Sequence, residues 1–226
     1  MNTNILLILV LSFVVTSCSQ TENINEKNIH LHVKELSSDK FEGREPGTVG
    51  GELTKKYIQE SFKSSGLQPI KKDFLLEVPL SKMEVNLDES YLKFKKAKNQ
   101  RVLIPGEETV FWSKRVQESI EIEDSEVLFI GYGIVAPEYE WNDYEGIDVN
   151  GKTLIALIND PGFKTQDPNL FNGNAMTYYG RWVYRFEEAA RQGAEALIII
   201  HETAPASYPW KVVQNSWSGK QIDLKR

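Results

Sequence analysis

The chain has 226 residues, of which 26 are Lys or Arg and 32 are Asp or Glu, so its formal net charge is −6. This acidic balance argues against a nucleic-acid-binding protein, which needs a basic surface to neutralise phosphates. With 41% hydrophobic and 26% charged residues, the composition is that of a globular protein and excludes wholesale disorder, collagen and a polytopic membrane protein. A single cysteine excludes an internal disulfide framework and a cysteine-based zinc cage.

An uncharged apolar run, ILLILVLSFVV, occupies residues 5–15. It is shorter than the roughly 17–25 residues that a transmembrane helix needs, and it fits the core of a signal peptide. Small residues then precede Cys18, the sole cysteine, in a pattern that resembles the bacterial lipoprotein cleavage box. We therefore expect a signal peptide over residues 1–17, acylation of Cys18 and a polar tether over residues 18–28.

This pattern predicts an extracytoplasmic protein with a lipid anchor in a bacterial membrane, in the outer membrane or periplasm. Two or more acyl chains on one cysteine give stable anchoring, whereas a single chain does not. The alternative is an ordinary secretory signal that happens to end near a cysteine, and no Lys or Arg precedes the apolar run.

Two helices are predicted before the first strands. A short amphipathic helix covers residues 29–36, and a loop punctuated by glycine and proline follows. A stronger helix runs from about residue 49 to 65, with Thr48 as its N-cap and Gly66 as the left-handed residue that ends it. Its buried stripe consists of Leu53, Tyr57, Ile58 and Phe62.

Strands dominate the next part of the chain. Apolar residues alternate with polar ones between residues 76 and 94, which predicts short strands or hairpins up to about residue 112. Continuous apolar runs at residues 127–130, 154–158 and 197–200 predict strands buried on both faces. A helix over residues 181–192 lies before the last run, and we expect its inward face to hold Val183, Phe186, Ala189 and Ala190.

Strand, helix and strand in this order predict a parallel crossover. Residues 220–226 carry no helix or strand able to close a sheet, so the sequence predicts that the chain stops inside a domain.

Three motifs have a chemical interpretation that we weigh against a plainer one. Residues 131–136 match the dinucleotide pattern G-x-G-x-x-A, but Pro137 follows where the mechanism requires a helix, which argues against nucleotide binding. Asp143, Glu145 and Asp148 could hold a hard cation, although a solvated acidic turn fits their spacing better. His201 follows a buried strand, and a structural role is favoured for it.

An aromatic stretch precedes the helix at residue 181. Large rigid side chains in a loop suit substrate or partner contact, so we take four residues as candidates for the rim of a substrate site. The equally weighted alternative is that the aromatic rings pack beneath a long loop. These candidates are Tyr178, Tyr179, Arg181 and Trp182.

Two segments resemble the M28 family of zinc aminopeptidases. The first reads LSSDKFEGREPGT from Leu36, leads into the predicted helix and closes with GLQP at residues 66–69. It is similar to the start of the family's catalytic domain. In physical terms, Gly43 and Gly47 permit a tight turn, and the Arg44 guanidinium can hold the loop by several hydrogen bonds.

The second segment, residues 127–216, is similar to the protease-associated (PA) domain that many members carry as an insert. The quoted motifs are GYG at residue 131, GK at 151, NDPG at 159 and EEAA at 187, followed by GA at 193. The resemblance implies an α/β fold: the start of an α/β/α catalytic domain over residues 29–112 and an incomplete, β-rich PA-type domain over residues 113–226.

What the resemblance implies for catalysis is limited by what this sequence contains. Family members hydrolyse peptides with two zinc ions held by His and carboxylate side chains that follow the inserted domain. We carry no catalytic residue and no metal ligand onto this chain, and we expect it to be inactive alone and to be the N-terminal fragment of a secreted peptidase. The alternative is a non-catalytic surface lipoprotein whose PA-type module binds peptides or glycans; a fragment unable to fold is a third reading.

Overall fold

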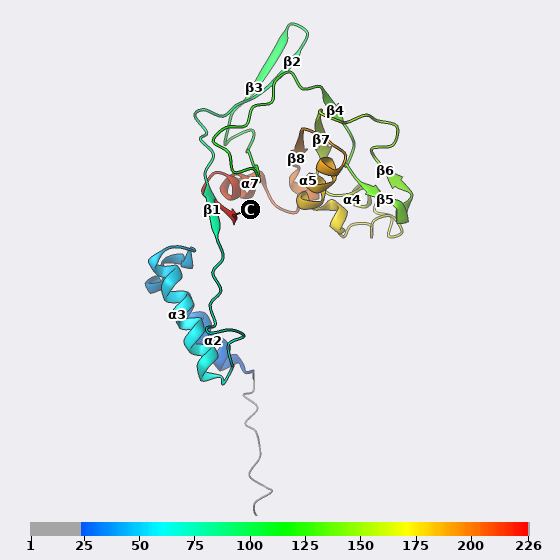
Figure 1. Cartoon of the computed structure of the whole chain (residues 1–226). Coiled ribbons are helices and arrows are strands. Elements are labelled where there is room, and N and C mark those ends of the chain that lie inside the picture. Colours follow the sequence, from blue (N-terminus) through cyan, green and yellow to red (C-terminus); the bar gives the residue numbers. More distant parts are fainter. Residues whose placement is uncertain (1–23, 226) are drawn as a thin grey trace, which may run out of the picture. The chain divides into compact units, whose positions relative to one another are not determined.

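The computed structural model describes residues 24–225 of the chain (Figure 1). The predicted signal peptide, Cys18 and most of the expected tether lie outside the described residues. Contacts divide the chain at residues 78 and 79, so that residues 24–78 form one compact unit and residues 79–225 a second. Helices and small sheets occur together, which confirms the predicted mixed α/β class in its general form. Within the described part, no helix is both long enough and apolar enough to cross a membrane.

The first unit is helical. Helix α2 spans Glu26–Leu36 and begins three residues before the expected start, because the Asn25 side chain caps it by accepting from the Asn28 amide at 2.9 Å. A 3-10 segment, η1, spans Asp39–Arg44, and α3 spans Val49–Ser64. The prediction for α3 is confirmed at both ends: the Thr48 hydroxyl accepts from Gly51, and Gly66 has a φ of 77°.

The loop between α2 and α3 packs closely on the second helix. Gly43 and Gly47 both have a positive φ, as a tight turn requires, and the Arg44 guanidinium donates to the Leu36 carbonyl. Phe41 is buried, and its carbonyl lies so near Gly50 that a β-carbon there would be 1.9 Å from the oxygen. The glycines at the start of α3 therefore let the loop lie against the helix.

In the second unit, β1 spans Leu80–Met83, β2 spans Leu92–Lys96 and β3 spans Asn99–Leu103. The alternation at residues 76–78 forms no strand. Strand β9, Gln221–Leu224, pairs antiparallel with β1, so the prediction that residues 220–226 hold no strand was wrong. The partner of β9 is β1, which lies at the other end of the unit. The sequence near β9 therefore gives no indication of the pairing.

The three apolar runs form one parallel sheet. Strand β4 spans Val127–Phe129, β7 spans Thr153–Leu157 and β8 spans Ala196–Ile200, in the order β4-β7-β8. Between β7 and β8 runs α5, Trp182–Arg191, so the predicted parallel crossover is confirmed.

The prediction that all three strands are buried on both faces was wrong. One face packs against Ala189 of α5 and holds Leu154 and Ala156, which are fully buried. On the other face Phe129 is 60% exposed and Ile200 is 41% exposed. A continuous apolar run shows that both faces of a strand are apolar, but it does not show that both are covered. Here a helix of the unit covers one face.

The predicted inward face of α5 is confirmed for Ala189 and wrong for Val183 and Ala190, which are exposed. Val183 is 51% exposed, whereas Tyr184, Arg185, Glu188 and Ala189 are buried. The hydrophobic pattern failed here because two charged residues point inward and find partners: Gln192 donates to Glu188 at 2.8 Å, and Arg185 donates to backbone carbonyls.

Short elements complete the unit. They are β5 (Val135–Ala136), η2 (Pro137–Tyr139), β6 (Trp141–Asn142), α4 (Pro161–Thr165), η3 (Tyr178–Gly180), α6 (Thr203–Ala206) and α7 (Trp210–Trp217). Trp112 joins two of the helices, because its ring lies 4.9 Å from that of Phe186 on α5 and 5.1 Å from that of Trp217 on α7.

Candidate functional site

A pocket of about 300 Å³ opens at the carboxyl end of the parallel sheet. Open α/β sheets bind ligands at this edge, because the loops after adjacent strands converge there. Tyr132 comes from the loop after β4, Asn159 and Asp160 from the end of β7, and Glu202 from the end of β8. The lining also includes Phe163 and Lys164 of α4, which offer an aromatic ring and an ammonium group.

Asp160 is the structural centre of this pocket. It is fully buried, and its carboxylate accepts from the amide of Gly162 at 3.2 Å and from the amide and hydroxyl of Thr177 at 2.9 and 2.7 Å. Asn159 adopts a φ of 71° and donates from its side chain to the Pro205 carbonyl at 2.8 Å. These hydrogen bonds hold α4, the loop before η3 and α6 together at the base of the pocket.

Three ionisable groups on the pocket wall offer contacts to a ligand. Burial raises the pKa of the Tyr132 phenol, and the carboxylates of Glu202 and Asp160 raise it further, so the hydroxyl stays protonated at neutral pH. Lys164 and Glu202 are exposed and carry opposite charges. With the Phe163 ring beside them, they suit a ligand that has polar backbone groups, ionic ends and apolar side chains.

The turn that carries Tyr132 is held by an acidic residue that we expected to be solvated. The Asp143 carboxylate accepts from the amides of Tyr132 and Ile134 at 3.2 and 3.0 Å. Burial raises the pKa of Asp143, and these backbone hydrogen bonds oppose the rise. Glu145 and Asp148 are exposed, as the acidic-turn interpretation predicts.

The four rim candidates do not gather at the pocket. Tyr179 donates to Glu138 at 2.7 Å and packs edge-on against Phe171, in an aromatic cluster with Tyr184. Tyr178 is 61% exposed, and Arg181 is exposed as well. Trp182 stacks on Trp217 of α7, with ring centroids 5.9 Å apart. Tyr179 and Trp182 therefore follow the packing alternative, while Tyr178 and Arg181 remain accessible.

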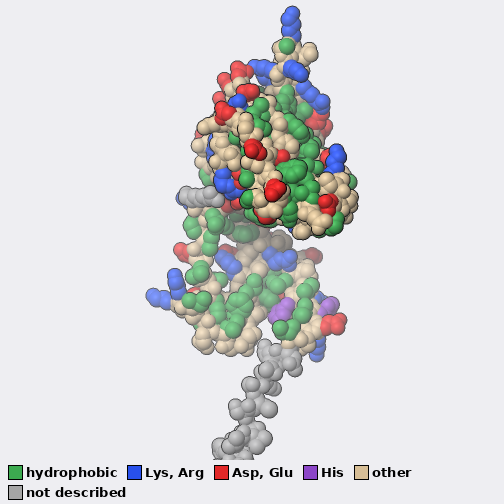
Figure 2. All heavy atoms as spheres, turned by 90° about the vertical axis from the view of Figure 1, so that its right-hand side faces the viewer, with side chains coloured by type: hydrophobic (Ala, Val, Ile, Leu, Met, Phe, Trp, Pro, Cys, Tyr) green, Lys and Arg blue, Asp and Glu red, His purple; other side chains and the backbone are tan. Residues whose placement is uncertain are grey.

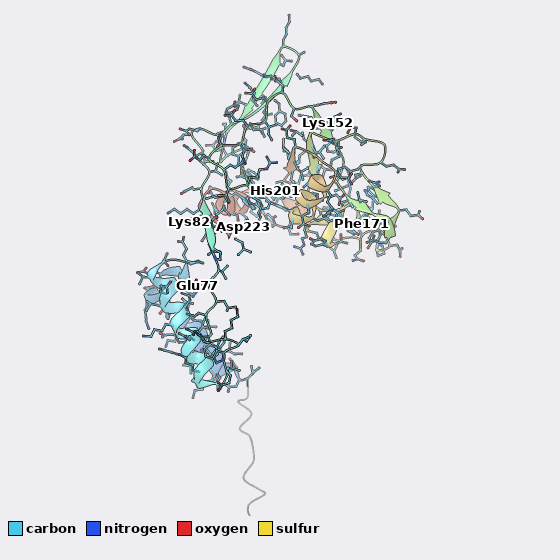
Figure 3. All side chains as sticks on the ribbon, in the orientation of Figure 1. Glu77, Lys82, Lys152, Phe171, His201 and Asp223 are labelled. Atoms are coloured by element: carbon cyan, nitrogen blue, oxygen red, sulfur yellow. The ribbon has the colours of Figure 1, made fainter. Side chains whose placement is uncertain are left out.

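His201 lies at the end of β8 (Figure 3). Its Nε2 is 3.1 Å from the Tyr208 carbonyl oxygen, and the rings of Tyr208 and Trp210 flank it. Its Nδ1 is buried and has no hydrogen-bond partner among the described residues. Such contacts fit the structural role that we predicted.

A larger hollow of about 380 Å³ lies in the first unit, between α3 and the turn that follows it. Within its lining Gln59 donates to Asp73, and Asp73 also accepts from the Phe74 amide at 2.6 Å. We prefer the pocket at the sheet edge, because the loops after adjacent parallel strands converge there and its lining offers exposed groups of both charges, Lys164 and Glu202.

The sequence indicates two of the segments that line this pocket, but it does not indicate that they lie next to each other. Tyr132 belongs to the GYG motif, and Asn159 and Asp160 belong to the NDPG motif. Lys164 and Glu202 carry no signal beyond their charge. Comparison with known proteins identifies no relative: no family model, no curated protein and no solved structure matches the chain.

Proposed function

We propose that this chain is the N-terminal portion of a secreted, lipid-anchored zinc peptidase of the M28 type, and that its second unit contains a PA-type module that binds peptides. One observation carries the proposal. Motifs that resemble the PA domain at residues 131–133 and at 159–162 lie apart in the sequence, yet their residues line a single pocket at the carboxyl edge of a parallel sheet.

A peptide fits the chemistry of this pocket. The Lys164 ammonium can pair with a peptide carboxylate, the Glu202 carboxylate with a free amine, and the Tyr132 hydroxyl can donate to a backbone carbonyl. Phe163 offers apolar contact for a side chain. Tyr178 and Arg181, which remain accessible, are candidates for contacts to a longer peptide.

The family's zinc ions are not assigned to these residues. Among residues 24–225, no group of three or more His, Cys, Asp or Glu side chains is placed to hold a metal ion. The residues described here therefore do not fit a zinc centre, and we assign them no hydrolytic step. The role proposed for them is to bind peptide for a catalytic centre built by other residues.

Calorimetric titration of the full chain with short peptides tests the binding. We expect peptides with free termini to bind, and either Lys164→Met or Glu202→Gln to weaken binding about tenfold, which is about 1.4 kcal/mol. Lys211→Met, which removes an exposed ammonium from α7, is the matched control and should leave the affinity unchanged. Equal affinity in all three variants would rule out this pocket as the peptide site.

Acylation is tested separately, in a bacterial host. Replacing Cys18 by Ser should abolish incorporation of labelled fatty acid and release the chain from the membrane fraction. Labelling that persists in the Cys18→Ser variant would contradict the proposed anchor.

A further inference from the structure

Strands β2 and β3 form a hairpin that extends away from the parallel sheet of the same unit (Figure 1). They pair only with each other, and a turn at Ala97, with a φ of 54°, joins them. Most of their side chains are exposed. The hairpin therefore presents its surface to solvent rather than to a core.

Charge is strongly segregated on this hairpin. Between Leu92 and Leu103 the sequence holds five basic residues and no acidic residue, in a chain whose net charge is −6. The basic residues are Lys93, Lys95, Lys96, Lys98 and Arg101. Those near the tip lie at the top of the view in Figure 2.

Only part of this charge is compensated within the chain. Lys95 pairs with Asp124 at 3.1 Å and Arg101 with Glu108 at 2.9 Å. Lys96 and Lys98 make no ion pair with any described residue, and Lys93 instead lies over the Tyr91 ring at 5.8 Å. Three cations are therefore available to an external anion.

Apolar side chains accompany the cations. Lys93 pairs with Val102 across the hairpin, so these two side chains share one face, while Tyr91 immediately precedes β2 and Ile104 immediately follows β3. Tyr91 is 66% exposed, Val102 is 51% exposed and Ile104 is 52% exposed. An exposed hairpin whose side chains and flanking residues mix lysine, tyrosine and aliphatic groups matches the boundary between lipid headgroups and acyl chains.

We propose that the β2–β3 hairpin binds the surface of an anionic membrane. Its lysines are attracted by the negative surface potential, and its apolar side chains leave water at the headgroup boundary. A nucleic acid would use the same cations, but it would gain little from Val102 and Ile104. This site is independent of both Cys18 acylation and the peptide pocket.

Vesicle sedimentation of the mature polypeptide, residues 18–226 with Cys18→Ser, tests the proposal without the apolar run or an acyl chain. We expect binding to phosphatidylglycerol-containing vesicles to be at least about tenfold tighter than to pure phosphatidylcholine, and to weaken as salt is raised. Equal binding to the two vesicle types would overturn the proposal.

Charge reversal locates the site. The double variant Lys96→Glu, Lys98→Glu should lose at least about tenfold in affinity for the anionic vesicles. The control Lys56→Glu, Lys63→Glu makes the same change of net charge at exposed positions on α3 and should keep its affinity. Equal losses in the two variants would show that net charge, not the hairpin, drives binding.

Substituting the apolar residues distinguishes a membrane from a nucleic acid as the ligand of the hairpin. The variant Val102→Ser, Ile104→Ser should bind anionic vesicles several-fold more weakly while circular dichroism shows an unchanged fold. Unchanged vesicle binding in this variant, or single-stranded DNA bound more tightly than anionic vesicles by the parent polypeptide, would contradict a membrane site.

Discussion

The Arg185 guanidinium donates from Nε to the carbonyl oxygen of Tyr132 at 2.8 Å, although the two residues are 53 positions apart. Its Nη1 donates to the carbonyl of Gly180 at 2.7 Å. Arg185 is fully buried, and desolvation lowers its pKa to about 10 while the nearby carboxylates of Asp160 and Asp143 oppose that shift. One cation thus joins α5 to the turn that carries a wall of the pocket.

Replacing Arg185 by Met should therefore destabilise the second unit. The substitution leaves buried carbonyl groups without donors, and we expect the free energy of unfolding in urea to fall by about 3 kcal/mol. Arg181→Met, which removes an exposed guanidinium one turn earlier, should change it by less than about 0.5 kcal/mol. Similar values for the two variants would show that the carbonyl contacts contribute little.

Gly50→Ala should destabilise the first unit. Alanine favours an exposed helix interior by about 1 kcal/mol over glycine, but here its β-carbon would meet the Phe41 carbonyl. We expect a net loss of at least about 2 kcal/mol, seen as faster hydrogen exchange of the α3 amides. Lys63→Ala on the exposed side of α3 serves as the control, and protection in Gly50→Ala equal to that control would refute the steric argument.

Tyr179→Phe should change how stability depends on pH. The hydrogen bond to Glu138 raises the pKa of Tyr179 to about 12 and lowers the pKa of Glu138 below 4.5. Stability linked to the tyrosine is complete below pH 10.0 and is lost as pH rises through its folded-state value. Stability linked to the carboxylate is present above pH 4.5 and is lost as pH falls.

The difference in urea-unfolding free energy between the parent and Tyr179→Phe should therefore be largest between pH 4.5 and 10.0 and shrink outside that window. Tyr178→Phe alters an exposed phenol that makes no hydrogen bond with any described residue, and its difference from the parent should stay flat. A flat profile for Tyr179→Phe as well would deny the coupling to Glu138.

Trp112→Ala should loosen the segment that leads from β3 to β4. The substitution removes ring contacts with Phe186 and Trp217 and the cation–π contact with Lys114, whose Nζ lies 5.3 Å from the ring centroid. We expect a loss of about 3 kcal/mol in unfolding free energy and faster proteolysis between residues 104 and 125. Trp112→Phe keeps an aromatic ring and should lose less than half as much.

Capping residues and apolar periodicity correctly predict the helices and strands that they determine. Helix α3 is bounded by Thr48 and Gly66 as expected, and α5 and the three parallel strands occur where the apolar periodicity places them. The pairing of β1 with β9 was not predictable, because it depends on residues at opposite ends of a unit.

The site was less accessible to sequence reasoning than the fold. Arg185 and Glu188 face inward against their polarity, because partners outside the helix pattern satisfy them. The sequence predicts a solvated acid at Asp143, because nothing local shows that its carboxylate accepts from amides in a turn that begins eleven residues earlier. Tyr132 and Asp160 lie in motifs that were recognised, but only the folded sheet brings them to one pocket.

The antiparallel pairing of β1 with β9 also determines how the second unit responds to mechanical tension. Leu80 pairs with Leu224, and the Lys225 amide donates to the Pro79 carbonyl at 2.9 Å, so both strands leave the pair at the same end (Figure 1). A pull on the two strand ends would load that outermost hydrogen bond first and then each rung in turn. The hydrogen bonds of the pair would therefore break one after another at low force, whereas a pair pulled along its strands would load all of them at once.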